Sequence, residues 1–344
     1  MPMSEPVPGR SRTIHAAVIS LEERAKDLSL EQILRATLDE AEALTGSHIG
    51  FYHFVEEDQE NLLLQAWSTR TEAEFCTAEG KGMHYPVSKA GVWADCLRVG
   101  HPLIQNDYQN VPNRKGLPPG HATVLRELVV PVKRSGRVVA VLGVGNKLAD
   151  YDEADIESVQ LLADLAWHLA ASKRMTLELE NSLAKNQALI QANRATNPQV
   201  ATLIRLMVGL GLRESEALEA RWKWLDPTQR TYTVGRSKTR TPRTIPVPSW
   251  LWSHILDMPK ALSDFICPCP DGTAHRGQFT KITLARAAKD LRIIGITPHS
   301  LRRTFATLHA QAGTSLADLQ GMMGHTSPVL TLLYPESVRL GRYQ

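Results

Sequence analysis

The sequence predicts two domains, an α+β domain with an antiparallel sheet and, after a helical linker, a second domain that contains a β-hairpin. Three observations lead to this prediction. A chain of 344 residues is longer than one hydrophobic core usually accommodates, and 43% hydrophobic with 22% charged residues is typical of a folded protein. The sign of the charge changes near residue 180. Helical periodicity crosses the same position.

Opposite charges distinguish the two halves of the chain. Residues 1–180 contain 18 Lys and Arg against 26 Asp and Glu, whereas residues 181–344 contain 21 Lys and Arg against 10 Asp and Glu. An excess of basic residues of this size is typical of a surface that meets a polyanion, and solubility alone does not require it. The second half is therefore predicted to bind nucleic acid.

Membrane and secreted classes do not fit the sequence. No stretch approaches the roughly 18 consecutive apolar residues that a membrane-spanning helix needs, and the first residues carry no apolar signal core. Four cysteines, at positions 76, 96, 267 and 269, are too few and too scattered for a disulfide framework. We therefore expect a cytoplasmic location, reduced thiols and no membrane partner.

The acidic half shows the pattern of an α+β module. Residues 15–44 carry apolar side chains at helical spacing, and this pattern stops at Gly46. Strand-like segments rich in β-branched and aromatic residues follow at 47–55, 61–67, 127–132 and 137–144, with a hairpin turn at 134–136. A returning helix is predicted from Asp152. One helix, an antiparallel sheet and a returning helix together predict the α+β fold.

Three strings in this half resemble a GAF sensor domain over roughly residues 15–172. They are HYPVSKAGVWADC at 84–96, PLIQNDY at 102–108, and LVVPV at 128–132 followed by VLGVGNK at 141–147. The resemblance implies a small-molecule partner, drawn from the cyclic nucleotides, chromophores and metabolites that members of the family bind, although some members bind none. Asn146-Lys147 and the later Tyr151-Asp-Glu153 partly match a motif of cyclic-nucleotide GAF domains. Tyr stands there in place of the usual Phe, so the motif assigns no ligand.

A helical linker is predicted over residues 173–194. Apolar residues recur at 3–4 spacing from Ile156 to Ile190, but Ser172, Thr176 and Asn186 fill other positions of the same seam. Both a solvated linker helix and a dimer seam agree with this pattern. The turn-forming residues at 193–198 predict where the helix ends.

Four segments of the basic half carry residues suited to phosphate chemistry. Arg213 follows Gly-Leu-Gly-Leu and precedes Glu-Ser-Glu216, an arrangement that taken alone is also typical of a helix cap. Two strand-like runs at 231–234 and 244–247 flank a connection with four cations, which favours contact with phosphates over packing. Thr297-Pro298 predicts a helix start that places His299 and Arg302 on one face. Gly324-His325 then precedes Tyr334 by nine residues.

These segments resemble the catalytic domain of the tyrosine recombinases, the phage integrase family, so residues 195–344 are predicted to form that domain. The resemblance implies a mainly α fold with a small antiparallel β-hairpin. Six residues match the family's catalytic positions in order: Arg213, the hairpin lysine Lys238, the pair His299 and Arg302, His325 of the Gly-His motif, and the nucleophile Tyr334. The implied partners are double-stranded DNA and further copies of the chain assembled on it.

The chemistry of these residue types agrees with the resemblance. A tyrosine hydroxyl, with a pKa of about 10, attacks a phosphodiester at neutral pH only when its proton is removed and the phosphate charge is neutralised. Planar guanidinium groups of Arg213 and Arg302 can bind the non-bridging oxygens. The histidines would supply base and hydrogen-bonding roles, Lys238 would protonate the departing 5′-hydroxyl, and the product would be a 3′-phosphotyrosine bond. No cofactor and no metal are implied, and the Cys267-Pro-Cys269 string near His275 is predicted to be a structural loop.

Two functions follow from this organisation. The first is a site-specific recombinase with a fused GAF domain of unknown ligand. The second is a GAF-regulated or fusion-derived DNA-binding protein without recombinase activity. The six residues favour the first function. The GAF-like module favours the second, because it occupies the place where tyrosine recombinases usually carry a core-binding domain that closes around the duplex.

Overall fold

The computed structural model describes residues 8–56, 58–75, 84–87, 90–112, 123–235, 242–258, 263–275 and 279–325. The chain divides into two compact units, Met1–Arg174 and Met175–Gln344. Each unit contains its own cluster of buried apolar side chains. Among the described residues, no helix has the length and apolar character needed to cross a membrane.

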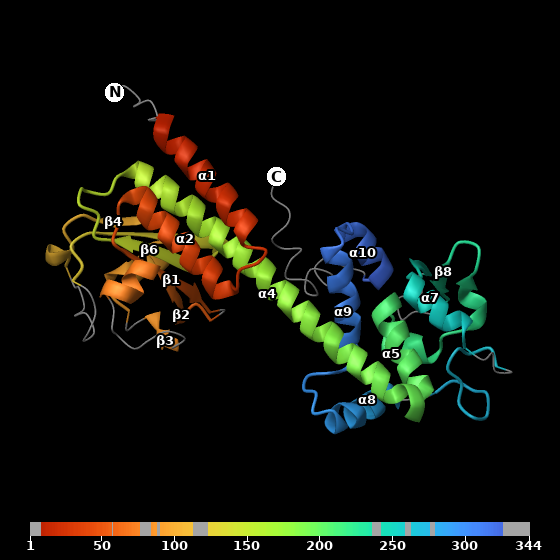
Figure 1. Ribbon diagram of the computed structural model, residues 1–344. Coiled ribbons are helices and arrows are strands. Elements are labelled where there is room, and N and C mark those ends of the chain that lie inside the picture. Colours follow the sequence, from red (N-terminus) through yellow and green to blue (C-terminus); the bar gives the residue numbers. More distant parts are fainter. Residues whose placement is uncertain are drawn as a thin grey trace. The chain divides into compact units, whose positions relative to one another are not determined.

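The first unit is built on a six-stranded antiparallel sheet with the strand order β3-β2-β1-β6-β5-β4 (Figure 1). Its strands are β1 (Ile49–Val55), β2 (Asn61–Trp67), β3 (His84–Pro86), β4 (Leu103–Gln105), β5 (Glu127–Arg134) and β6 (Arg137–Gly145). The four strand segments predicted at 47–55, 61–67, 127–132 and 137–144 are confirmed as β1, β2, β5 and β6. The short strand β3 lies inside the string at 84–96 and was not predicted.

Helices cover both faces of this sheet. On one face, α1 (Pro8–Arg24), α2 (Leu30–Thr45) and the first part of α4 (Glu153–Thr196) pack on the strands through fully buried leucines such as Leu34, Leu142 and Leu162. On the other face, α3 (Asp95–Val99) follows a short 3-10 helix (Val92–Ala94) and places Cys96 against Val129 and Val141. The unit is therefore an α+β fold.

The first helical segment differs from the prediction. Residues 15–44 were expected to form one helix, but α1 ends at Arg24 and α2 begins at Leu30. The reason is local: the Ser29 hydroxyl accepts the backbone N–H of Gln32, and the Gln32 side chain accepts the backbone N–H of Ser29, which caps the start of a new helix. The predicted end at Gly46 is confirmed, since Gly46 caps α2 with a φ of 70°.

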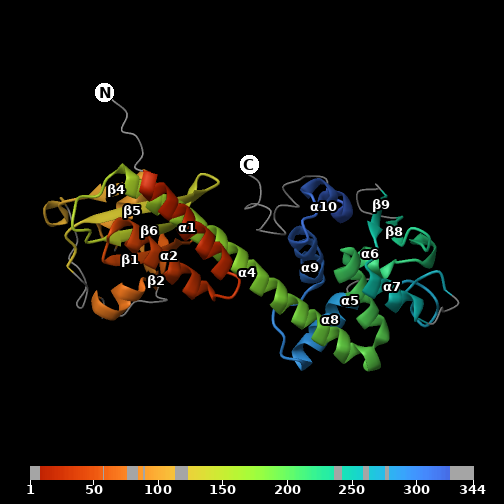
Figure 2. The same ribbon diagram turned by 45° about the horizontal axis from the view of Figure 1, so that its top comes forward.

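The second unit is mainly helical, with a small three-stranded sheet in the order β7-β8-β9 (Figure 2). Its helices are α5 (Pro198–Leu210), α6 (Glu214–Leu218), α7 (Ser249–Leu256), α8 (Phe279–Asp290), α9 (Pro298–Gln311) and α10 (Leu316–Met323). The predicted hairpin is confirmed by the antiparallel pairing of β8 (Thr231–Val234) with β9 (Arg243–Pro246), and β7 (Leu225–Asp226) adds a third, unpredicted strand. Helix α5 is buried along most of its length and forms the centre of this core.

The second part of α4 packs within the second unit. The segment predicted as a linker, residues 173–194, is helical, and Leu189 in it is fully buried in the core of this unit. Asn186, one of the polar seam residues, is buried and donates to Thr304 Oγ1 at 3.2 Å, while Ser182 Oγ lies 2.7 Å from the same oxygen. The helix ends at Thr196, and Asn197 caps α5.

Candidate active site

Three segments of the second unit bring Arg213, Arg302 and His325 together. Arg213 is the N-cap residue of α6, directly after the glycine-rich turn that ends α5. Arg302 lies on α9, and His325 follows Gly324, the left-handed C-cap of α10. The Nη1 atom of Arg302 donates to the carbonyl of Gly211 at 2.6 Å, which ties the turn before Arg213 to α9.

Glycine is required at position 211. Its φ is 59°, and a Cβ atom there would lie 2.4 Å from Cδ1 of Phe305 on α9. Any side chain would separate α5 from α9, and the Arg302 hydrogen bond depends on their close approach. The Gly-Leu-Arg string therefore has a packing reason in addition to its place beside the site.

Glu216 is the shared acceptor of this cluster. Its carboxylate accepts the backbone N–H of Arg213 at 2.8 Å and Nη1 of Arg213 at 3.0 Å. Arg243 donates to both oxygens, at 3.0 and 2.5 Å, and Nη1 of Arg302 lies 3.8 Å away. Burial alone would raise the pKa of Glu216, but the hydrogen bonds and charges of Arg243 and Arg213 outweigh it and hold that pKa below its usual value. The helix cap and the ion-pair cluster are thus formed by the same carboxylate.

The same three arginines bind the C-terminal carbonyls of α10. Arg243 Nε donates to Met322 O at 2.8 Å, Arg302 Nη2 donates to Met323 O, and Arg213 Nη2 donates to Gly324 O at 2.9 Å. These carbonyl groups have no partner within the helix and carry its negative dipole end, which favours cations. The next residue is His325, so the cluster fixes the backbone from which that imidazole extends.

His325 is a neutral imidazole in this environment. Burial lowers its pKa to about 4, and the charges of Arg302, Arg213 and Arg243 together with His299 act in the same direction. Its Nε2 atom lies 3.2 Å from Nη2 of Arg302. Because a guanidinium only donates, this nitrogen accepts and the imidazole proton resides on Nδ1. Burial and the charges of Arg302 and Arg303 also lower the pKa of His299, which lies exposed on the first turn of α9.

The described site thus contains four of the six predicted residues. Arg302 is buried, Arg213 and His325 are partly buried, and His299 is exposed. Three of the four side chains are therefore accessible to solvent, and Arg302 is enclosed by protein. Lys238 and Tyr334 lie outside the described residues.

The prediction for Arg243 was wrong. Arg243 is one of the four hairpin cations that were expected to contact phosphates, yet its side chain is only 6% exposed and is paired with Glu216. Sequence reasoning treated Glu216 only as a helix cap and missed its partners on β9 and α9.

The Cys267 and Cys269 loop is held by hydrogen bonds to α5. Cys269 Sγ lies 3.3 Å from Nδ1 of His275, whose Nε2 lies 2.9 Å from Oε1 of Gln199. Gln199 in turn donates to Pro268 O at 2.7 Å. Within the described ranges, no group of three or more His, Cys, Asp and Glu side chains is arranged to hold a metal ion.

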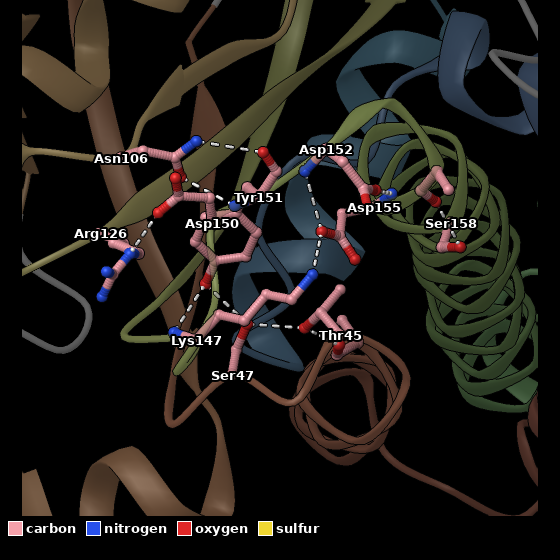
Figure 3. Close-up of polar contacts among 12 residues, drawn as sticks. Thr45, Ser47, Asn106, Arg126, Lys147, Asp150, Tyr151, Asp152, Asp155 and Ser158 are labelled. Carbon is pink, nitrogen blue, oxygen red and sulfur yellow. Dashed lines mark hydrogen bonds and ion pairs between the residues drawn. The ribbon is translucent and has the colours of Figure 1, made fainter.

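In the first unit, the partial motif at 146–153 fixes the start of α4. Lys147 Nζ pairs with the buried Asp155 at 2.5 Å, and the Tyr151 hydroxyl lies 2.7 Å from Ser47 Oγ (Figure 3). The Asn106 side chain bonds to both the N–H and the C=O of Tyr151, at 2.8 and 3.1 Å. These contacts join the end of β6 to the first turn of α4.

Two buried titratable side chains of this unit were not predicted. Burial raises the pKa of Glu127 on β5 to about 8, and burial lowers the pKa of His53 on β1 to about 3. His53 packs against Trp93, with ring centroids 4.6 Å apart. Glu127 lies two positions before Val129 on β5, and side chains two positions apart on a strand share one face. The Glu127 side chain is therefore on the sheet face that carries Cys96. A charged residue at an inward position of an apolar strand was the signal that could have indicated Glu127. Burial raises the pKa of Cys96 to about 12, as expected for a core thiol.

Comparison with known proteins assigns both units. A family model described as GAF domain matches residues 27–169, and a model described as phage integrase family matches residues 181–338. The chain joins a GAF domain to a phage integrase domain. The integrase match begins inside α4, in the region where this helix packs on the second core.

Curated relatives divide in the same way. The methyl sulfide methyltransferase-associated sensor of Methanosarcina acetivorans is 37% identical over 161 residues, which are 46% of this chain and 16% of the sensor. The integrase of Escherichia phage 186 is 31% identical over 149 residues, 43% of this chain and 41% of the integrase. Tyrosine recombinase XerA of Pyrococcus furiosus is 28% identical over 138 residues, 38% of this chain and 48% of XerA. The chain therefore spans less than half the length of each of these relatives.

Proposed function

We propose that this chain cleaves and rejoins DNA through a 3′-phosphotyrosine intermediate, as a site-specific recombinase. Tyr334 is the nucleophile in this proposal, and Arg213 and Arg302 bind the scissile phosphate. The observation that carries it is the cluster around Glu216, which brings Arg213, Arg302 and His325 together from three separate segments. A structural helix cap would need none of the other arginines.

The charges of the site suit a phosphodiester that gains negative charge in the transition state. Three guanidinium groups surround one carboxylate, so the cluster is net positive. Arg213 keeps 29% of its side chain exposed, and two of its five N–H groups are used by Glu216 and Gly324. Donors held before the reaction stabilise the developing charge without having to reorganise.

The two histidines have proton-accepting forms at neutral pH. The pKa of His299 is lowered, and that of His325 is lowered to about 4, so both imidazoles are neutral there. In this proposal His299 receives the tyrosine proton, and His325, whose Nε2 faces Arg302, holds a phosphate oxygen through its Nδ1–H. Lys238 on the hairpin would then protonate the 5′-oxygen that leaves.

Double-stranded DNA is the proposed partner of the integrase domain, with further copies of the chain assembled on it. The basic residues of positions 181–344 support this part of the proposal. A small molecule is the proposed partner of the GAF domain. The alternative, a DNA-binding protein without recombinase activity, is favoured by one feature: a GAF domain precedes the integrase domain where related recombinases place a second DNA-binding domain.

Covalent capture tests the proposal and separates it from the alternative. The full chain is incubated with nicked duplexes that tile the DNA on both sides of its own gene, and adducts that resist SDS are detected on a denaturing gel. We expect an adduct with the wild type and none with Tyr334→Phe, which removes one hydroxyl and no charge and so should bind DNA with unchanged affinity. Binding without any adduct in the wild type would favour the alternative. An adduct that persists in Tyr334→Phe would exclude this nucleophile.

A further inference from the structure

We propose that Arg243 is a positioning residue of the active site. Its guanidinium fixes Glu216 and the last turn of α10, and these two groups hold the residues that face the phosphate. The inference rests on the proposed recombinase function for its catalytic consequence. Its structural part, the placement of His325, can be measured without DNA.

All three guanidinium nitrogens of Arg243 donate hydrogen bonds. Nη1 and Nη2 donate to the two oxygens of Glu216 at 3.0 and 2.5 Å, and Nε donates to Met322 O at 2.8 Å. Its side chain is 6% exposed and that of Glu216 is 3% exposed. A buried bidentate pair of this kind has one defined geometry, and a lysine has no planar fork that could reproduce it.

Gly324 lies against the same guanidinium. Its φ is 60°, and a Cβ atom at this position would lie 3.1 Å from both Cδ and Nη1 of Arg243. The turn that presents His325 therefore rests directly on the Arg243 side chain. A change of that side chain should move the turn and, with it, the imidazole.

Arg243 also determines how Glu216 is shared. It binds both carboxylate oxygens, while Arg213 reaches one of them at 3.0 Å and Arg302 lies 3.8 Å away. Without Arg243, a buried carboxylate would draw Arg213 and Arg302 toward itself, because an unpaired buried charge is costly. Those two guanidinium groups would then be less available to DNA. Arg243 is too buried to bind a phosphate, so its effect on the reaction is indirect.

The position of Arg243 in the chain connects the hairpin to the site. It is the first residue of β9, five positions after Lys238. The side chain therefore anchors the strand that returns from the hairpin. Its contacts reach α6 through Glu216 and α10 through Met322, so one residue links the three segments.

The test compares Arg243→Met, which removes the charge and the fork, with Arg243→Lys, which keeps the charge and removes the fork. Arg137→Met, an exposed β6 position of the GAF domain, is the control for loss of one positive charge. Three quantities are measured on the full chain: affinity for DNA by fluorescence anisotropy, the rate of adduct formation on a nicked duplex, and the pKa of His325 by NMR of the free protein. His325→Asn assigns the imidazole signal.

We expect Arg243→Met to slow adduct formation by about 100-fold, the effect of a misplacement of roughly 1 Å, while DNA affinity changes by less than about threefold. The pKa of His325 should rise, because one of the charges facing it is gone while Arg302, Arg213 and His299 remain. Arg243→Lys should slow the adduct by about tenfold with a smaller rise in this pKa. The Arg137→Met control should match the wild type in all three quantities.

Other results would overturn the positioning role. It is wrong if folded Arg243→Met forms adducts within about twofold of the wild-type rate, or if a parallel loss of DNA affinity accounts for the whole loss in rate. If Arg243→Met does not melt cooperatively, Arg243→Lys decides by the same two criteria. If the wild type forms no adduct, the proposed function fails. The NMR arm then decides alone, and an unmoved His325 pKa in Arg243→Lys, which keeps the charge and removes the fork, would reject the structural part.

Discussion

Glu216 accepts both the backbone N–H of Arg213, at 2.8 Å, and its guanidinium Nη1, at 3.0 Å. One carboxylate thus sets the start of α6 and the direction of the arginine side chain that precedes it. Helix capping and site assembly were alternative interpretations of this segment, and in the structure they are the same interaction. If the guanidinium turned away, Glu216 would keep the backbone N–H of Arg213 and lose its bond to Nη1.

Arg302→Lys should destabilise the integrase domain and abolish adduct formation. The buried guanidinium bonds to Gly211 O and Met323 O and lies 3.2 Å from His325 Nε2, and an ammonium cannot reach all three. Loss of two or three such bonds should lower the free energy of unfolding by about 2–4 kcal/mol. Urea denaturation of the full chain measures it.

Arg303→Ala on the same helix is the matched control. Arg303 is 45% exposed and pairs with Glu178, which is 63% exposed, at 3.1 Å. A surface pair of this kind should contribute less than about 1 kcal/mol, so this variant should unfold like the wild type. Equal destabilisation by both variants would contradict the special role of Arg302.

The pair His299 and Arg302 could be predicted from the sequence because its signals are local. Thr297 caps α9 through Ser300, three residues away, and Pro298 occupies the first turn. The same kind of signal, Ser29 with Gln32, was present between α1 and α2, but helical periodicity on both sides concealed it.

The shared role of Glu216 could not be predicted in this way. Arg243 lies 27 positions from Glu216 in the sequence, and nothing in either segment indicates that the hairpin folds back onto α6. The order of the first sheet depends on similar long-range pairing, since β6 lies between β1 and β5. Periodicity identifies strands, but tertiary packing decides which strands become neighbours.

DNA binding should weaken steeply as salt increases. Each phosphate that a Lys or Arg neutralises releases condensed counterions, so the affinity of the full chain should fall at least about tenfold between 50 and 200 mM monovalent salt. Fluorescence anisotropy with a labelled duplex measures the slope. A fragment of residues 1–174, in which acidic residues outnumber basic ones, should not bind. Salt-independent binding, or binding by that fragment, would contradict the assignment of DNA to the integrase domain.

The GAF domain should lose stability as the pH falls from about 4.5 toward 3, because above 4.5 the proton taken up by folded Glu127, whose pKa burial raises to about 8, offsets the contribution of His53. Burial lowers the pKa of His53 to about 3 in the folded protein, from a usual value of 6.5. Between these values the unfolded chain takes up a proton that the folded domain excludes, so acid favours unfolding by up to about 1.4 kcal/mol per pH unit. This contribution to stability is fully present above pH 6.5.

Hydrogen exchange of β1 amides as a function of pH reports this loss within the GAF domain. His53→Gln should flatten the dependence between about pH 4.5 and 3, since it removes the group that titrates there. His101→Gln, at an exposed position, is the matched control and should retain the wild-type profile. A His53→Gln profile that still falls as steeply as that of the wild type would assign the acid sensitivity to another group.

The last prediction concerns where the integrase domain begins. Leu189 of α4 is fully buried in the integrase core, and Asn186 and Ser182 contact Thr304, two residues after Arg302. A fragment that starts at residue 195 lacks all of these contacts, whereas one that starts at residue 175 keeps them. Burial of one leucine contributes about 2–5 kcal/mol. The shorter fragment should therefore melt at a clearly lower temperature, and 175–344 should fold alone.

A pair of substitutions in the full chain tests the same contact without truncation. Leu189→Ala should destabilise the integrase domain, while Leu177→Ala should not, because Leu177 lies on the same helix and is 50% exposed. Both variants lose the same atoms and keep helix-forming residues, so a difference between them reports packing rather than helix propensity. Equal melting temperatures for the two variants, together with equal stability of the two fragments, would place the domain boundary after α4 instead of within it.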